Sequence, residues 1–336
     1  MAIVYFTEQG GKVAKEGSSL FLKKDKDVLV RIPIKNLEAL VVFGRISFTP
    51  QAIDLLLIEA VPVSLLSIRG RLKGSLRPVG TKNVPLKIKQ VKSYSDEGRK
   101  KQWVRSLIEA KISNSCEVIE GFRKNHGQDP NLKNASRKIK SIAERLYNVN
   151  EIEKMRAIEG EAARYYFEAL PRMCKGELEF RGRSRRPPHD PMNSLISFAY
   201  ALITAEIVAL LFGVGIDPDI GLYHEVRYGR PSMALDVLEE FRHPIADKLA
   251  IYINNNRILK NNDFQKGDKN SVTMTDEARK KFLHEYEKRM TAPLHKEESK
   301  AKSFRDILKR QAERARRFIE KDEEYCPFTM KNMNGT

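Results

Sequence analysis

The longest apolar stretch of the chain, SLISFAYALITAEIVALLFGVGI at residues 194–216, decides between a membrane protein and a soluble helical one. Its length alone is enough for a transmembrane helix. Glu206 stands at its middle, however, and a carboxylate at the bilayer centre costs roughly 2.5–3.5 kcal/mol on insertion scales. Gly213 and Gly215 also shorten its regular part to about 19 residues. We therefore expect a buried core helix; the alternative, a membrane span, would pellet with membranes.

Around this segment, apolar residues recur at helical intervals from Glu97 onwards. Two polar segments interrupt the pattern, an arginine-rich loop at residues 176–190 and residues 259–275, which we expect to be a mobile loop. The C-terminal part is therefore predicted to be nearly all helix. Its other helical stretches are WVRSLIEAKISNSCEVIEGF, IKSIAERLY, IEKMRAIEGEAARYYFEALP, SMALDVLEEF, IADKLAIYI and ILKRQAERARRFI.

The first 78 residues have a different pattern, with short β-branched and aromatic runs separated by glycines. One helix is expected among these strands, at residues 50–60, with Thr49 as N-cap and Pro50 at the first helical position. The predicted strands contain IVYF (3–6), LFL (20–22), VLVRIPI (28–34) and LVVFG (40–44).

The segment between the two patterns, residues 71–96, contains Pro, Gly and many Lys, which is typical of a basic connector. We place the domain boundary near residue 92. The predicted fold class is α+β, with a small β domain carrying one helix at residues 1–92 and a larger all-α domain at 93–336. This division agrees with a length of 336 residues, since a domain spans roughly 150 residues.

The charge balance indicates a polyanionic partner. The chain has 61 Lys and Arg against 44 Asp and Glu, which leaves a net charge of +17, more than solubility requires. Nucleic acid is the first expectation and an acidic membrane surface the second.

No signal peptide is visible, and Cys116, Cys174 and Cys326 form no CxxC pair, so we expect a reducing cytoplasm. Motifs of the P-loop, dinucleotide-binding and G-x-S-x-G types are absent from the sequence.

Glu159 is the carboxylate that stands out, because it interrupts an apolar stripe on a predicted helix. A buried carboxylate requires a cation, a hydrogen-bond network or a raised pKa. On helix geometry alone, pairing with an arginine is an equally good interpretation. Glu161 faces the other way and is expected at the surface. The apolar neighbours of Glu159 are Ile152, Met155, Ala162, Ala163, Tyr166 and Leu170.

A histidine and an acidic helix follow the core helix. His224 comes after a Gly, Asp and Pro-rich loop, and the next helix has Asp236, Glu239 and Glu240 on one face. Taken singly, each feature is compatible with an ordinary surface. Together with Glu159 they provide the oxygen and nitrogen ligands that suit Mg²⁺ or Mn²⁺ better than structural zinc. In a basic protein, such an ion indicates phosphodiester chemistry.

Arginines are concentrated in the loop ELEFRGRSRRPPHDPMN, where several guanidinium groups could follow successive phosphates. A solvated charge run is the alternative. For the arginines of the last helix, at 310, 314, 316 and 317, a solvated face is the preferred interpretation. The candidate DNA-binding residues of the loop are Arg181, Arg183, Arg185 and Arg186.

Several long motifs, in one order along nearly the whole chain, resemble the CRISPR-associated protein one family, the spacer-acquisition integrase and endonuclease of prokaryotic immunity. The motifs are IPIKNLEALVVFGRISFTPQAIDLLLIEAVPVSLLS, IEGEAARYYF, FRGRSRRPPHDPMNSLISFAYALI, GIDPDIGLYHEVRYGRPSMALDVLEEFRHPIAD and YCPF.

The resemblance implies catalytic, metal-binding roles for three residues. Glu159 opens the family's E-G-x-A-A motif, and the family's histidine falls on His224. The third ligand, at the second position of a D-x-x-[DE] pair, falls on Glu239, with Asp236 in support. Some members have Asp at that second position, so whether Asp236 is a direct ligand stays open. Asn193, in DPMNSL, is implied to have a supporting or packing role.

The resemblance also implies an assembly. It consists of homodimers formed through the β domain, two of which are bridged by CRISPR-associated protein two. The complex would bind a short DNA duplex and join its 3′-hydroxyls to the CRISPR repeat by transesterification, with Mg²⁺ or Mn²⁺ as cofactor. We expect the activity to fail at acid pH. The competing hypothesis, a non-catalytic architectural DNA-binding protein, predicts salt-sensitive binding that is indifferent to EDTA.

Overall fold

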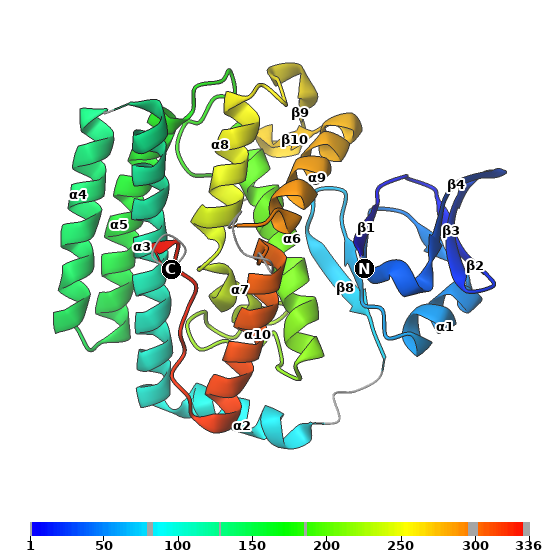
Figure 1. The fold of residues 1–336 in the computed structure, drawn as a ribbon, viewed down its shortest axis with the longest axis horizontal. Helices are drawn as coiled ribbons and strands as arrows, with labels where there is room; N and C mark the ends of the chain where they lie inside the picture. The colour runs from blue at the N-terminus through cyan, green and yellow to red at the C-terminus, as the bar shows by residue number, and fades with distance from the viewer. Residues whose placement is uncertain (1, 79–82, 128, 185–186, 295–301, 332–336) are drawn as a thin grey trace. The chain divides into compact units, whose positions relative to one another are not determined.

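The computed structural model describes residues 2–78, 83–127, 129–184, 187–294 and 302–331. The chain divides into two compact units, Met1–Thr81 and Lys82–Thr336. The first consists mainly of strands and the second mainly of helices, as Figure 1 shows. This is the α+β composition that the sequence predicts.

Two four-stranded sheets form the N-terminal unit. In the first sheet β1 and β7 run parallel to β5, and β8 is antiparallel to β7. In the second, β3 is antiparallel to both β4 and β2, and β2 is parallel to β6. The first sheet has the order β1 (Ala2–Phe6), β5 (Leu37–Phe43), β7 (Val63–Leu66), β8 (Leu72–Leu76), and the second β4 (Asp27–Pro33), β3 (Ser19–Lys24), β2 (Lys12–Glu16), β6 (Ser47–Phe48).

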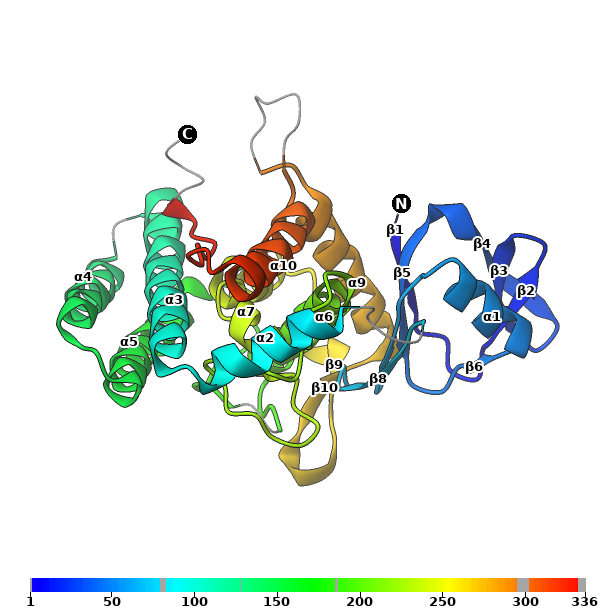
Figure 2. The same cartoon turned by 90° about the horizontal axis from the view of Figure 1, so that it is seen from below.

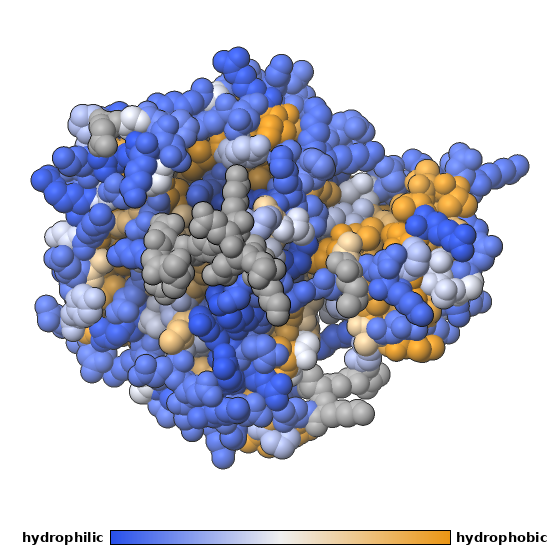
Figure 3. Space-filling view, in the orientation of Figure 1, coloured by the Kyte–Doolittle hydropathy of each residue, from blue (hydrophilic) through white to orange (hydrophobic). Residues whose placement is uncertain are grey.

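The single helix of this unit, α1 (Pro50–Ile58), begins as expected, because Thr49 Oγ1 accepts a hydrogen bond from the Ala52 amide at 3.2 Å. Its Leu56 packs in one apolar cluster with Leu20 and Leu40 from the two sheets. Other apolar side chains are exposed on α1 and on β4, where Figure 3 shows orange surface. Because β4 pairs only with β3 within the described chain, it is an edge strand.

The second unit is built from nine helices of regular length among the described residues and a short ribbon. Figures 1 and 2 show α3, α4 and α5 side by side, while α6 packs against α7, α8 and α10. The helices are α2 (Val84–Ser95), α3 (Glu97–His126), α4 (Pro130–Glu144), α5 (Ile152–Met173), α6 (Pro191–Gly213), α7 (Ser232–Leu238), α8 (Lys248–Asn255), α9 (Asp276–Thr291) and α10 (Phe304–Lys321).

Helix α6 contains the apolar stretch with Glu206. Within the described residues it is the one helix with the length and hydropathy of a membrane span, and most of it is buried in the unit. Glu206 accepts hydrogen bonds from Tyr286 Oη at 2.9 Å and Arg305 Nη2 at 3.1 Å. Burial raises the pKa of Glu206, although Arg305 opposes the shift. The carboxylate that argued against a membrane span therefore joins α6 to α9 and α10.

The domain boundary lies at residues 81/82, earlier than the expected position near 92. Residues 71–96 are not an irregular connector, because they contain β8 and α2. Helix α2 belongs to the helical unit: Gln90 is buried, its Nε2 donates to the carbonyls of Asp217 and Ile220 at 2.8 and 2.9 Å, and its Oε1 accepts from the Asp217 amide. Lys89 and Lys92 of this segment lie on the exposed side of an ordered helix.

Residues 259–275 do not form the expected irregular loop. They fold into an antiparallel pair, β9 (Phe264–Lys266) and β10 (Val272–Met274), with one short 3₁₀ turn before β9 and another between the two strands. Val272 and Met274 are buried, and the Val272 amide donates to the Pro188 carbonyl at 2.8 Å. The C-terminal unit is therefore not all-α as predicted. Cys116, Cys174 and Cys326 are free.

We predict that Arg305→Met lowers the free energy of unfolding by about 3–5 kcal/mol, because Glu206 loses the guanidinium held against it inside the unit. Urea unfolding followed by circular dichroism measures this loss. Lys154→Met, which removes an exposed pair with Glu151, is the control and should leave the transition unchanged. Equal transitions for the two variants would contradict the prediction.

Candidate active site

Glu159 lies on α5 and faces α3, where a lysine meets it. Its side chain is 17% exposed, and one carboxylate oxygen contacts the ammonium group of Lys111, whose side chain is 9% exposed. The same ammonium lies 2.7 Å from Oε2 of Glu239. Glu159 therefore has the cationic partner that its place in an apolar stripe predicts. The partner is a lysine rather than an arginine, and it contacts two carboxylates.

Glu239 follows the last residue of α7 and is almost fully buried. Its Oε1 lies 2.9 Å from Arg242 Nη2 and 3.5 Å from His224 Nε2. Burial alone would raise the pKa of Glu239, but Arg242, Lys111 and His224 together outweigh burial and lower it to about 2. Glu239 is thus an ionised carboxylate at every pH at which the protein would work.

Asp236 fixes the loop that carries His224. It is fully buried on α7, and its carboxylate accepts hydrogen bonds from the amides of Leu222, Tyr223 and His224 at 2.7, 2.9 and 2.8 Å. It also lies 2.8 Å from Nδ1 of His224. Because a carboxylate accepts, the contact with Asp236 assigns a ring proton to Nδ1, and it turns Nε2 towards Glu239.

The structure therefore brings together Glu159, His224 and Glu239, with Asp236 one layer behind them. The three acidic residues that the sequence placed on one helical face are all buried, which excludes the alternative of a solvated face, and their carboxylates have different partners. Glu240 turns towards the C-terminal segment, where it accepts from the Phe328 amide at 2.6 Å and from Tyr325 Oη. The predicted acidic face is wrong because α7 ends at Leu238, before the two glutamates.

The donor types at this site fit a hard divalent cation. Two carboxylates and an imidazole converge, and the buried Oε2 of Glu239 is contacted by the Lys111 ammonium at 2.7 Å. In the arrangement described, however, no three His, Cys, Asp or Glu side chains approach closely enough to enclose a metal. Lys111 lies between the two carboxylates, where such an ion would bind.

Asn193 has a structural role beside the site. Its Oδ1 accepts from Arg183 Nη1 at 2.8 Å and from the Ser184 amide at 3.0 Å, and its Nδ2 donates to Asp190 Oδ2 at 2.6 Å. Asp190 in turn caps α6 by accepting from the Asn193 amide. These contacts fasten the arginine-rich loop to the start of α6.

The structure describes two of the four candidate arginines of that loop. Arg183 points inwards and lies over the Tyr200 ring, with its guanidinium carbon 5.4 Å from the ring centroid. Arg181 is largely exposed and pairs with Glu179 at 2.8 Å. Arg185 and Arg186 lie outside the described residues. Of the two described arginines, Arg181 is the one at the surface.

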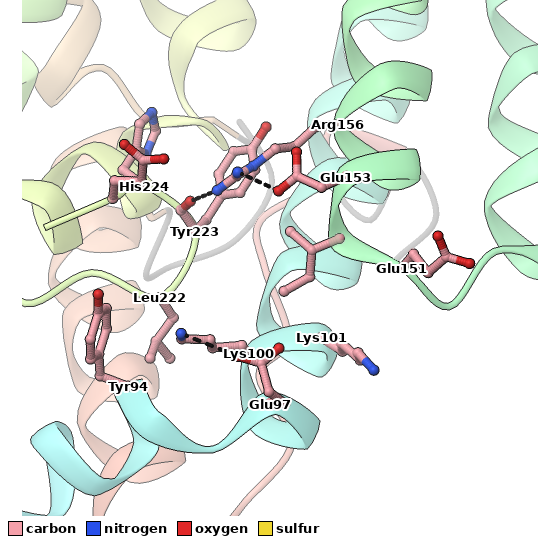
Figure 4. Close-up of a pocket in the computed structure, with 12 residues that line it drawn as sticks. Tyr94, Glu97, Lys100, Lys101, Glu151, Glu153, Arg156, Leu222, Tyr223 and His224 are labelled. Carbon is pink, nitrogen blue, oxygen red and sulfur yellow. Dashed lines mark hydrogen bonds and ion pairs between the residues drawn. The ribbon is translucent and has the colours of Figure 1, made fainter.

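A pocket of about 470 Å³ opens beside His224. Figure 4 shows His224 at one end, Lys100 and Lys101 at the other, and Arg156 with Tyr223 between them. Arg156 is held by the Tyr223 carbonyl at 2.6 Å and by Glu153 at 2.9 Å. The pocket thus adds cationic groups from α3 and α5 next to the site.

Sequence reasoning missed Lys111 and Arg242. Lys111 follows Leu107 and Ile108 at helical spacing, so it interrupts an apolar stripe on α3 as Glu159 does on α5. A lysine in the apolar stripe of α3 and a glutamate in that of α5 were thus the sequence signal that could have predicted this ion pair. Arg242 begins a π-helical segment, Arg242–Asp247, which no simple spacing rule predicts.

Comparison with known proteins identifies the family. The profile of the family described as CRISPR associated protein Cas1 matches residues 4–288. A curated relative from Rhodospirillum rubrum, named CRISPR-associated endonuclease Cas1 2, is 34% identical over 297 residues, covering 85% of each chain.

Two solved structures share the fold at lower identity. A casposase bound to integration product is 20% identical with a TM-score of 0.84, covering 98% of this chain and 94% of that one. A chain of a Cas6-RT-Cas1–Cas2 complex is 21% identical with a TM-score of 0.82, covering 98% of this chain and 36% of that one. From the profile match and the curated relative, this chain belongs to the Cas1 family of CRISPR-associated proteins.

Proposed function

We propose that this protein is a divalent-metal-dependent DNA endonuclease and integrase that inserts spacers into a CRISPR array. The observation that carries the proposal is the convergence of Glu159, Glu239 and the Nε2 lone pair of His224, with Asp236 holding the histidine ring. Family membership supports it, because the curated relative is named an endonuclease. The casposase that shares the fold is described as bound to integration product.

In this proposal, Glu159, Glu239 and His224 hold Mg²⁺ or Mn²⁺. When bound, the ion would polarise the scissile phosphate and offset charge on the leaving oxygen. Asp236 keeps the proton on Nδ1 of His224, so that Nε2 stays available. Arg242, which contacts Glu239, would contribute positive charge that stabilises the negative charge developing on the phosphate in the transition state.

The pocket beside His224 is proposed to receive the end of the reacting DNA strand. Lys100, Lys101 and Arg156 line it, and phosphate contacts from such groups place a strand without reading its sequence. A net charge of +17 supports DNA as the partner of the whole chain. We further propose that the protein forms a homodimer and that this homodimer assembles with Cas2. The name of the Cas6-RT-Cas1–Cas2 complex supports the assembly with Cas2.

Glu159→Gln should reduce DNA strand transfer by at least about a hundredfold while sparing the fold, because it removes a metal-ligating charge from the site. The assay is joining on a branched DNA that mimics a half-integrated spacer, with Mn²⁺ or with EDTA. Glu161→Gln is the matched control, since Glu161 lies two residues away and pairs with Arg145 at the surface. His224→Ala and Glu239→Gln should resemble Glu159→Gln.

Retained joining in all three site variants would sink the proposal. DNA binding by the native protein without any joining, indifferent to EDTA and to these substitutions, would favour the architectural alternative instead.

Asp236→Asn should weaken Mn²⁺ binding by roughly 10–100-fold, because the amide cannot accept all the hydrogen bonds that now orient the histidine loop. Isothermal titration with Mn²⁺ measures the change. Asp276→Asn alters a carboxylate at the surface end of α9 and serves as control. If both variants bind Mn²⁺ like the native protein, Asp236 does not position His224.

Strand transfer should be lower at pH 5 than at pH 7.5. A protonated imidazole has no lone pair for a metal, whereas Glu239, with its pKa lowered to about 2, stays ionised throughout. A pH–rate profile tests this, and activity that is unchanged at pH 5 would count against the site.

A further inference from the structure

Lys111 is a cation inside the helical unit. It lies on the apolar face of α3 with Leu107 and Ile108, and only 9% of its side chain is exposed. A lysine in such a place is stable only when its charge is compensated. The compensation comes from two carboxylates at once, because its ammonium contacts both Glu159 on α5 and Glu239 after α7.

The charges of this cluster nearly balance without a metal. Glu159, Glu239 and the buried Asp236 carry three negative charges, and Lys111 and Arg242 carry two positive ones. A divalent ion placed among them would leave an excess of positive charge in a buried site, which is costly at low dielectric. One of the two side chains must therefore withdraw when an ion binds.

Geometry identifies Lys111 as the group that withdraws. Its ammonium stands between the two carboxylates and ends a flexible four-carbon chain. Arg242 contacts Glu239 from one side only, and its guanidinium carbon lies 5.1 Å from the centroid of the Tyr200 ring. Arg242 can therefore remain in place while an ion replaces the Lys111 ammonium between the two carboxylates.

We propose that the Lys111 ammonium and the divalent ion are alternative occupants of the space between Glu159 and Glu239. This inference rests on the proposed function, since it concerns the same site. Without metal, Lys111 holds the two carboxylates together against their repulsion. When the ion binds, it displaces the ammonium, so part of its binding free energy is lost in breaking the lysine contacts.

The test is Mn²⁺ binding to the DNA-free protein, followed by electron paramagnetic resonance of the free ion. Lys111→Met keeps the length of the side chain and removes its charge, so it should bind Mn²⁺ at least about tenfold more tightly than the native protein. Its metal-free form should melt at least about 5 °C lower, and Mn²⁺ should raise its Tm by more than it raises the native Tm.

Lys124→Met, an exposed position on the same helix, is the matched control and should change neither quantity. Lys111→Gln is a second variant that keeps a polar donor in case the methionine variant folds poorly, and it should also tighten Mn²⁺ binding. Native-like or weaker Mn²⁺ binding by the Lys111 variants would overturn the exchange, because the lysine would then be neutral to the ion or support it.

The two proposals fail differently. If the native protein binds Mn²⁺ less tightly than Lys111→Met but joins no branched DNA, the proposed exchange is supported and the proposed integrase activity is contradicted. If the native protein joins branched DNA in a metal-dependent way, and the native and Lys111→Met proteins bind Mn²⁺ equally tightly, the integrase proposal is supported and the exchange is contradicted.

Discussion

Two carboxylates that face each other inside a helical unit repel strongly unless positive charge stands between them. Glu159 and Glu239 come from helices far apart in sequence, and Lys111 on a third helix joins them. This requirement connects α3, α5 and the end of α7. It also makes the site responsive to cations, because any group that replaces the ammonium must supply at least as much positive charge to the same two carboxylates.

The rest of the site consists of supports that keep these groups in place. Asp236 uses its carboxylate to tie the backbone of the His224 loop to α7, and Trp103 Nε1 on α3 reaches the same carboxylate at 3.2 Å. On the other side, Glu240 fastens the C-terminal segment through Tyr325 and the Phe328 amide. Glu239 thus lies between two buried acidic anchors, which gives phosphodiester chemistry a rigid frame.

Much of the fold was predictable where local pattern and burial agree. The β-branched runs of the first unit, the Thr49 cap of α1 and the apolar α6 are such cases. Prediction failed where polar residues form ordered structure: the lysines of α2 hid a face containing buried Gln90, and the β9–β10 ribbon has few apolar residues. Glu159 was found because it broke a stripe. Lys111 breaks a stripe on α3 in the same way, but its pairing with Glu159 was missed because the contact between the two helices is visible only in three dimensions.

The central claim is that a divalent ion binds between Glu159, His224 and Glu239. Anomalous diffraction from a crystal grown with Mn²⁺ tests it most directly. The account predicts one peak roughly 2.0–2.2 Å from a carboxylate oxygen of each glutamate and from Nε2 of His224, with Asp236 still bonded to Nδ1 and Lys111 withdrawn. A peak elsewhere, or one that leaves the Lys111 ammonium between the carboxylates, would contradict it.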